Sequence, residues 1–138
     1  MREILFRGKT LTNRWVYGSY YKQDEFYGTK EDASVIITSR EALTYDQALD
    51  FTIVIPETVG QYTGLTDKNG KKIFEGDILK GSWNTVLIIF YDEISTSYRV
   101  KTTTGHEREP SYYGVEKWEV IGNIHDNPEL LKGERYVD

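Results

Sequence analysis

The sequence predicts a mainly β fold with one or two short helices, in which an N-terminal antiparallel sheet precedes a small SH3-like β-barrel. Two observations carry this prediction. Apolar and polar residues alternate over several short runs, the pattern of strands that bury one face. Glycine-containing turns separate these runs, and aromatic residues, which suit pleated surfaces, make up 14% of the chain. A length of 138 residues allows one domain or two small β units packed together.

Residues 1–72 are predicted to form the hairpin-based sheet. Strands are expected at 3–7, 14–22, 35–38 and 51–56, with a short helix near 44–50 before the last of them. We expect Pro56 to end the fourth strand, because proline has no N–H to donate to a strand ladder.

The stretch 59–81 has several closely spaced glycines, and we interpret it as two turns between strands. Asn69 and Gly70 tolerate the positive φ angles of a hairpin turn, and Asp67 can accept a hydrogen bond from the backbone two residues on. Gly76 and Asp77 predict a second corner. The glycines are therefore expected to bend the chain and not to cradle a ligand.

Residues 73–133 are predicted to form the SH3-like barrel, and 134–138 a tail. Four strands are expected, at 77–83, 84–92, 97–104 and 117–124. Val86–Phe90 is apolar on both faces, so it should be the central strand. Asn127 and Pro128 predict the start of a short helix over 127–131, with Asn127 as its N-cap.

The composition excludes several kinds of site. Cysteine is absent, so the chain has no disulfide, no thiolate metal site and no cysteine nucleophile. Seventeen basic and 22 acidic residues give a net charge of −5, which disfavours electrostatic capture of nucleic acid. The first apolar run is far too short for a signal peptide or a membrane span, so we expect a cytoplasmic protein with no membrane partner.

Three segments together carry a family resemblance. They are "REILFRGK" at 2–9, "ETVGQYTGLTDKNGKKIFEGDIL" at 57–79 and "VIGNIHDNPELL" at 120–131. With them the chain resembles the YopX family of phage and prophage proteins from Arg2 to about Leu131, while 23–52 matches little. The resemblance implies a phage or prophage origin, residence in the host bacterial cytoplasm and assembly into a homo-oligomer. It implies no catalytic residue and no cofactor.

Catalytic and metal sites have weak support in the sequence. The carboxylates Glu75 and Asp77, with Asp67 and Glu57 nearby, could carry out acid–base chemistry or hold Mg²⁺. The alternative is that Asp77 accepts backbone N–H groups at its turn. We favour this alternative, and we keep a carboxylate-dependent enzyme only as the third functional hypothesis.

Other catalytic patterns fail on spacing. His106 and His125 have no neighbour at metal-ligand spacing, and Ser82, Ser95 and Ser111 do not stand in a nucleophile elbow. The run 64–72 is unlike a phosphate-binding loop, because its glycines have five residues between them and Lys71 is followed by lysine. We therefore predict no enzyme, no cofactor and no metal.

Aromatic residues are the strongest candidates for function. Tyr and Trp dominate protein–protein hot spots, although the alternative is that most of these rings pack in the core. The predicted interaction surface consists of Trp15, Tyr17, Tyr20, Tyr21, Trp83, Tyr112, Tyr113 and Trp118. The leading hypothesis is a homo-oligomer that also binds a host or phage protein.

Lysines supply the second functional hypothesis, nucleic-acid binding by the barrel. Basic side chains beside Trp83 and Tyr98 would combine backbone contact with base stacking. The alternative is that they are solvated and protect strand edges. The possible nucleic-acid patch consists of Lys68, Lys71, Lys72, Lys80 and Lys101.

Overall fold

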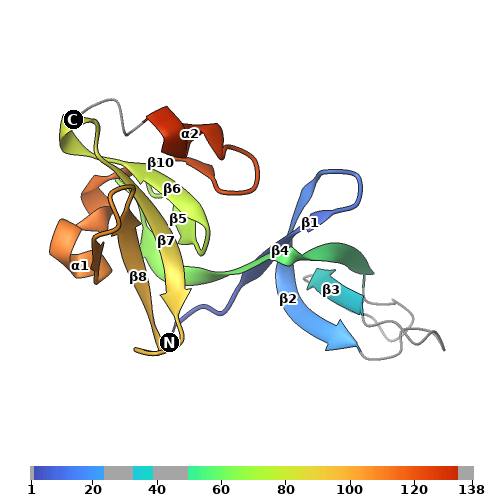
Figure 1. Cartoon of the computed structure of the whole chain (residues 1–138). Coiled ribbons are helices and arrows are strands. Elements are labelled where there is room, and N and C mark those ends of the chain that lie inside the picture. Colours follow the sequence, from blue (N-terminus) through green and yellow to red (C-terminus); the bar gives the residue numbers. More distant parts are fainter. Residues whose placement is uncertain (1, 24–32, 39–49, 134–138) are drawn as a thin grey trace. The chain divides into compact units, whose positions relative to one another are not determined.

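The computed structural model describes residues 2–23, 33–38 and 50–133 (Figure 1). The chain divides into two compact units, Met1–Gln61 and Tyr62–Asp138, whereas the sequence pattern predicts a boundary after residue 72. Both units are built mainly from antiparallel strands, which confirms the predicted fold class.

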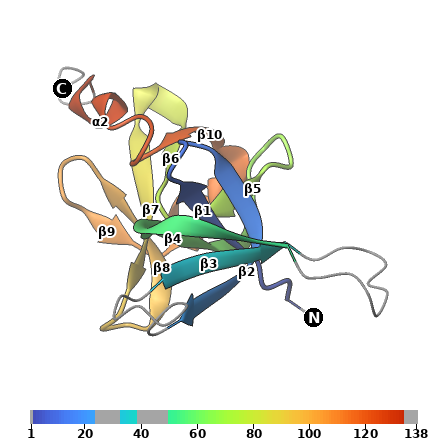
Figure 2. The ribbon, with the colours of Figure 1, turned by 90° about the vertical axis from the view of Figure 1, so that its right-hand side faces the viewer.

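The first unit contains a closed ring of antiparallel strands. β1 pairs with both β2 and β4, and β3 pairs with both β2 and β4, so each of the four strands has two neighbours. Figure 2 shows β3 alongside β4. The ring consists of β1 (Phe6–Thr10), β2 (Trp15–Gln23), β3 (Ala33–Thr38) and the first part of β4 (Asp50–Thr66).

The prediction that Pro56 ends its strand is wrong, because β4 continues through it to Thr66. The β1–β4 register jumps from Lys9↔Ile55 to Arg7↔Gly60, so the four residues 56–59 of β4 lie opposite Gly8 alone. Pro56 therefore occupies a bulge, where no ladder bond requires its N–H. The Thr58 hydroxyl closes this bulge, since it accepts the Lys9 N–H at 2.8 Å and donates to the Ile55 carbonyl at 2.6 Å.

The interior of the first unit combines aliphatic side chains with polar ones, among them Ser34. Ile36 and Val54 are at most 2% exposed. The Tyr20 hydroxyl lies 3.2 Å from the hydroxyl of the buried Ser34, and the Tyr20 ring centroid lies 5.7 Å from that of Phe6. Of the predicted helix near 44–50, residues 44–49 lie outside the described residues, and Asp50 begins β4.

The second unit contains a five-stranded antiparallel sheet in the order β10-β6-β7-β8-β9. β7 is its central strand, as the apolar run Val86–Phe90 predicts. The short β5 (Lys72–Phe74) pairs with the end of β4. An SH3-like barrel stays a prediction. The sheet consists of β6 (Asp77–Lys80), β7 (Val86–Asp92), β8 (Ser97–Thr102), β9 (Glu107–Arg108) and β10 (Glu119–Asn123).

Short helical segments complete the second unit. α2 (Glu129–Gly133) begins two residues after the predicted start. α1 (Pro110–Tyr113) lies between the third and fourth predicted strands of this unit, where no helix was predicted, and the 3₁₀ turns η2 (Ser82–Asn84) and η3 (Val115–Lys117) were also not predicted. One core cluster holds the unit together, with Tyr113, Trp118 and Val120 packed against it. Its buried members are Ile73, Leu79, Leu87, Ile89, Val100 and Val115.

Candidate protein-interaction surfaces

The Asp67 carboxylate is a structural clamp. Its Oδ1 accepts the N–H groups of Asn69 at 2.8 Å and Lys71 at 2.9 Å, which confirms the bond predicted for the turn. Its Oδ2 accepts the N–H of Val120 at 3.0 Å. Burial raises the pKa of Asp67, but the amides of Val120, Lys71 and Asn69 together lower that pKa below its ordinary value. Asp67 therefore acts as a charged hydrogen-bond acceptor that joins the 67–70 turn to β10.

The second carboxylate candidate also has a structural role. Asp77 is 1% exposed, and its Oδ2 accepts the Phe74 N–H at 2.7 Å. Gly76 has a φ of 92°, so this segment is the predicted corner. The Gly76 N–H donates to the Ile89 carbonyl at 2.8 Å, and its carbonyl accepts the Ile124 N–H at 2.9 Å. The buried position of Asp77 favours this role over proton transfer to a substrate.

The histidines lie in turns. His106 Nδ1 lies 3.1 Å from the Thr104 hydroxyl in an exposed hairpin turn, and the His125 N–H donates to Asn123 Oδ1 at 3.0 Å. Across the part of the chain that the structure describes, no group of three or more His, Cys, Asp or Glu side chains could hold a metal ion.

The segment 123–127 forms a hydrogen-bonded corner before α2. Asn123 Oδ1 accepts the N–H of Asp126 at 2.9 Å, and Asn127 Oδ1 accepts the N–H of Asn123 at 3.2 Å. Asn127 also begins the helical turn with its carbonyl, which accepts the Leu130 N–H at 3.1 Å. Asn127 therefore lies at the start of the helical turn, as predicted. Its side-chain oxygen, however, accepts the N–H of Asn123, which precedes the turn.

Four of the eight predicted interface aromatics have packing roles. Tyr20 lies over Phe6 inside the first unit, and Tyr113 and Trp118 pack against the core of the second unit. The Trp118 Nε1–H donates to the Tyr113 carbonyl at 3.0 Å. Trp15 is half-buried, with the Arg7 guanidinium carbon 4.7 Å from its ring centroid. The sequence could not separate these rings from exposed ones, because exposure depends on packing against residues that are distant along the chain.

The other four aromatics are exposed. Tyr17 and Tyr21 are 47% and 54% exposed on β2, and Trp83 and Tyr112 are 92% and 64% exposed on the second unit. The Tyr112 ring packs edge-on against Tyr113, with their centroids 5.0 Å apart.

The exposed tyrosines of β2 belong to a larger apolar surface on the first unit, which we call the tyrosine face. The register aligns Tyr21 with Val35 and Ile53, and Ser19 with Ile37 and Phe51. Phe51 and Ile53 are 45% and 40% exposed. Sequence reasoning missed them as surface residues, although the alternation at 51–54 places both on one face of a strand. The tyrosine face consists of Tyr17, Tyr21, Phe51 and Ile53, with the half-buried Ile37 between them.

Trp83 stands at the tip of the β6–β7 hairpin in a strained conformation. Trp83 and Asn84 have φ angles of 62° and 56°, so both central residues of the turn are left-handed. Bonds from Thr85 N–H to the Ser82 carbonyl at 3.1 Å and from Gly81 N–H to the Thr85 carbonyl at 3.0 Å close the hairpin. Such turns favour Asn and Gly, and a bulky residue there is a genuine outlier. The strain lies at one of the most exposed apolar side chains described here.

Replacing Trp83 with glycine should therefore stabilise the second unit. Glycine adopts the positive φ without steric cost, and little packing is lost because Trp83 is 92% exposed. We expect the free energy of unfolding to rise by about 1 kcal/mol, the lower end of the cost of a strained backbone. Urea unfolding followed by circular dichroism measures this, with Ser82→Gly as a control. A clear loss of stability would show that Trp83 holds the fold.

Three lysines of the predicted patch, Lys68, Lys71 and Lys72, lie in or next to the β4–β5 turn, and Lys80 and Lys101 lie on β6 and β8. Lys68 and Lys80 both lie beside Glu119, since Lys68 Nζ is 3.8 Å from its Oε2 and Lys80 pairs with it across β6–β10. Lys71 and Lys72 lie at the β4–β5 turn, and Lys101 lies on β8 with its Nζ 5.7 Å from the Phe90 ring centroid. Glu119 therefore offsets part of the charge of Lys68 and Lys80. Nucleic-acid binding by this set stays a prediction.

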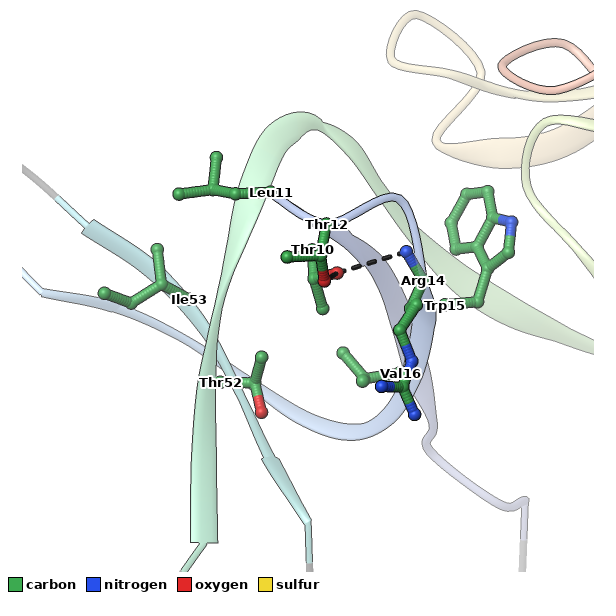
Figure 3. Close-up of a pocket in the computed structure, with 8 residues that line it drawn as sticks. All are labelled: Thr10, Leu11, Thr12, Arg14, Trp15, Val16, Thr52 and Ile53. Carbon is green, nitrogen blue, oxygen red and sulfur yellow. Dashed lines mark hydrogen bonds between the residues drawn. The ribbon is translucent and has the colours of Figure 1, made fainter.

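The first unit has a hollow of about 450 Å³ at the β1–β2 turn. Leu11, Val16 and Ile53 supply apolar lining, and three threonines and Arg14 supply polar groups. The Thr10 hydroxyl accepts the Arg14 N–H at 3.1 Å, and Figure 3 shows the Trp15 ring turned away from the other seven side chains. The residues that line it are Thr10, Leu11, Thr12, Arg14, Trp15, Val16, Thr52 and Ile53.

Comparisons with known proteins give a family and a fold, without an activity. A search of curated proteins finds no match. Among solved structures, the crystal structure of protein EF1440 from Enterococcus faecalis is similar, with a TM-score of 0.58 and 25% sequence identity. That match covers 95% of this chain and 99% of the other. No helix within the described residues is long and apolar enough to cross a membrane. The model of the YopX protein family matches residues 5–132, nearly the whole chain, so this chain belongs to the YopX family.

Proposed function

We propose that this protein is a non-enzymatic phage or prophage accessory protein of the host cytoplasm that assembles with copies of itself and binds a host or phage protein. The tyrosine face carries the proposal. Four large apolar side chains on β2 and β4, each 40–54% exposed, lie on the two strands that pair with β3. Contiguous exposed apolar surface of this kind marks interaction sites more often than scattered single residues do.

The composition of the tyrosine face suits a protein partner. Tyrosine offers a large rigid ring and a hydroxyl that can stay hydrated before binding, which is why it is enriched in hot spots. Phe51 and Ile53 add apolar area on the neighbouring part of β4. A partner that covers this face would remove four half-exposed apolar side chains from water at once.

The roles of the carboxylates support a non-enzymatic protein. Among the carboxylates of the described residues, Asp67 and Asp77 are the most buried, and both accept backbone N–H groups at turns. Both residues belong to the segment 57–79, which carries part of the family resemblance. Their hydrogen bonds give this segment a structural role.

Capture from a bacterial lysate tests the binding proposal. Tagged wild-type protein should retain a defined partner, and Tyr17→Ser combined with Tyr21→Ser should weaken retention at least tenfold, because a hot-spot residue contributes about 2 kcal/mol or more. Tyr91→Ser is the matched control, since Tyr91 is 40% exposed on the second unit. Circular dichroism confirms that the variants fold. Equal retention by wild type and the double variant would refute a role for the tyrosine face.

A further inference from the structure

We infer that Trp83 of one copy inserts into the 450 Å³ hollow at the β1–β2 turn of a second copy. The inference deepens the proposed self-assembly and rests on it, because it names the two surfaces that join. One surface is convex and belongs to the second unit, and the other is concave and belongs to the first.

Trp83 has the properties of a preformed anchor. It is 92% exposed, and two backbone hydrogen bonds hold the turn on either side of it. Its left-handed backbone is costly for the fold, while glycine at the same position would avoid that cost. Strain that the fold does not require points to a contact made outside it. A rigid tip also loses little conformational entropy on docking.

The hollow offers what an indole ring needs. Its volume lies within the range of about 300–1,000 Å³ of pockets that enclose small molecules, so it has room for one ring system. Leu11, Val16 and Ile53 supply apolar contacts. The threonine hydroxyls can accept the indole N–H. The Arg14 guanidinium can lie over the ring face, and tryptophan is the best aromatic partner for such a cation.

The two surfaces differ, so the contact is heterologous. Each copy has one Trp83 to donate and one hollow to offer, and repetition of such a contact produces a ring or an open chain. One buried tryptophan covers about 150–250 Å², well below the roughly 1,200 Å² of a stable interface. A single contact is therefore weak, and we expect assembly to depend strongly on protein concentration.

Sedimentation velocity over a concentration series tests the inference with three variants. Trp83→Gly removes the anchor and suits the turn, whereas Leu11→Glu places a charge at the rim of the hollow, where Leu11 is 78% exposed. We expect each to raise the concentration needed for assembly at least tenfold. Ile94→Glu, the same kind of change at the 96% exposed tip of the β7–β8 hairpin, should leave assembly as in wild type.

A mixture of the first two variants gives the sharpest result. The Leu11→Glu chain keeps its Trp83, and the Trp83→Gly chain keeps its hollow, so only one productive pair exists. The mixture is measured at ten times the concentration at which half of the wild-type protein is assembled. It should form a one-to-one dimer and nothing larger. A mixture that stays monomeric, or a Trp83→Gly chain that assembles like wild type, would overturn this inference but not the proposed self-assembly. A wild-type chain that stays monomeric would overturn the proposed self-assembly as well.

Discussion

Replacing Asp67 with alanine should destabilise the second unit by about 4 kcal/mol. The change removes the acceptor of three backbone N–H groups, those of Asn69, Lys71 and Val120. A hydrogen bond to a charged group contributes about 1.5–3 kcal/mol, and the three contributions overlap because the freed turn can reach water. Denaturant unfolding measures the loss. Asp92→Ala is the control, because Asp92 accepts the Ile94 N–H in an exposed turn and should matter little.

The same carboxylate should make stability depend on pH. The amides that surround Asp67 lower its pKa in the folded state below the value in the unfolded chain. Its contribution is therefore complete above the unfolded pKa of about 3.9 and is lost as the pH falls through the lower folded pKa. Unfolding curves between pH 7 and pH 2.5 should decline less steeply for Asp67→Asn than for wild type. If the stability of both proteins declined equally with falling pH, the charged carboxylate of Asp67 would not stabilise the fold.

Replacing Gly18 with alanine should disrupt the first unit. A Cβ at this position would overlap the carbonyl oxygen of Ile37 on the neighbouring strand, and it would press on the Ile36 side chain at 3.2 Å. Backbone cannot rotate away as a flexible side chain can, so β2 and β3 must separate locally. We expect a loss of about 3 kcal/mol, the upper part of the usual range for overpacking.

Ser19→Ala provides the control for this variant. Ser19 is the next residue on β2, is exposed, and pairs with the same Ile37, so its loss should change stability by less than about 0.5 kcal/mol. Thermal unfolding and near-ultraviolet circular dichroism compare the two. If Gly18→Ala folds with wild-type stability, the closed pairing of β2 with β3 is wrong.

Local chemistry made part of this structure predictable. The 67–70 turn follows from Asn69, Gly70 and the side chain of Asp67, which act within four residues of one another. The central position of β7 follows from its apolar run. The bond from Asp67 to Val120 spans 53 residues, so no local pattern could indicate it. The passage of β4 through Pro56 depends on Thr58, which closes the bulge against β1 only in the folded unit.

The interaction surfaces were predicted less well, for two reasons. Aromatic type alone does not separate the half-buried Tyr113 from the exposed Tyr112 next to it on α1, because contact with a core built from distant parts of the chain decides which ring is covered. The hairpin at Trp83 lacks the usual Asn-Gly pair, so its left-handed turn had no sequence signature. By contrast, α1 carried usable signals, with Pro110 at its start and Gly114 in a left-handed conformation at its end.

The molar mass of the wild-type chain in solution, measured against concentration, tests the central claim most directly. The claim is that exposed aromatic side chains join copies of this protein. We predict a mass that rises above the 16.0 kDa of one chain as concentration increases, while Trp83→Gly stays near 16.0 kDa over the same range. A wild-type mass of 16.0 kDa at every concentration would contradict the account.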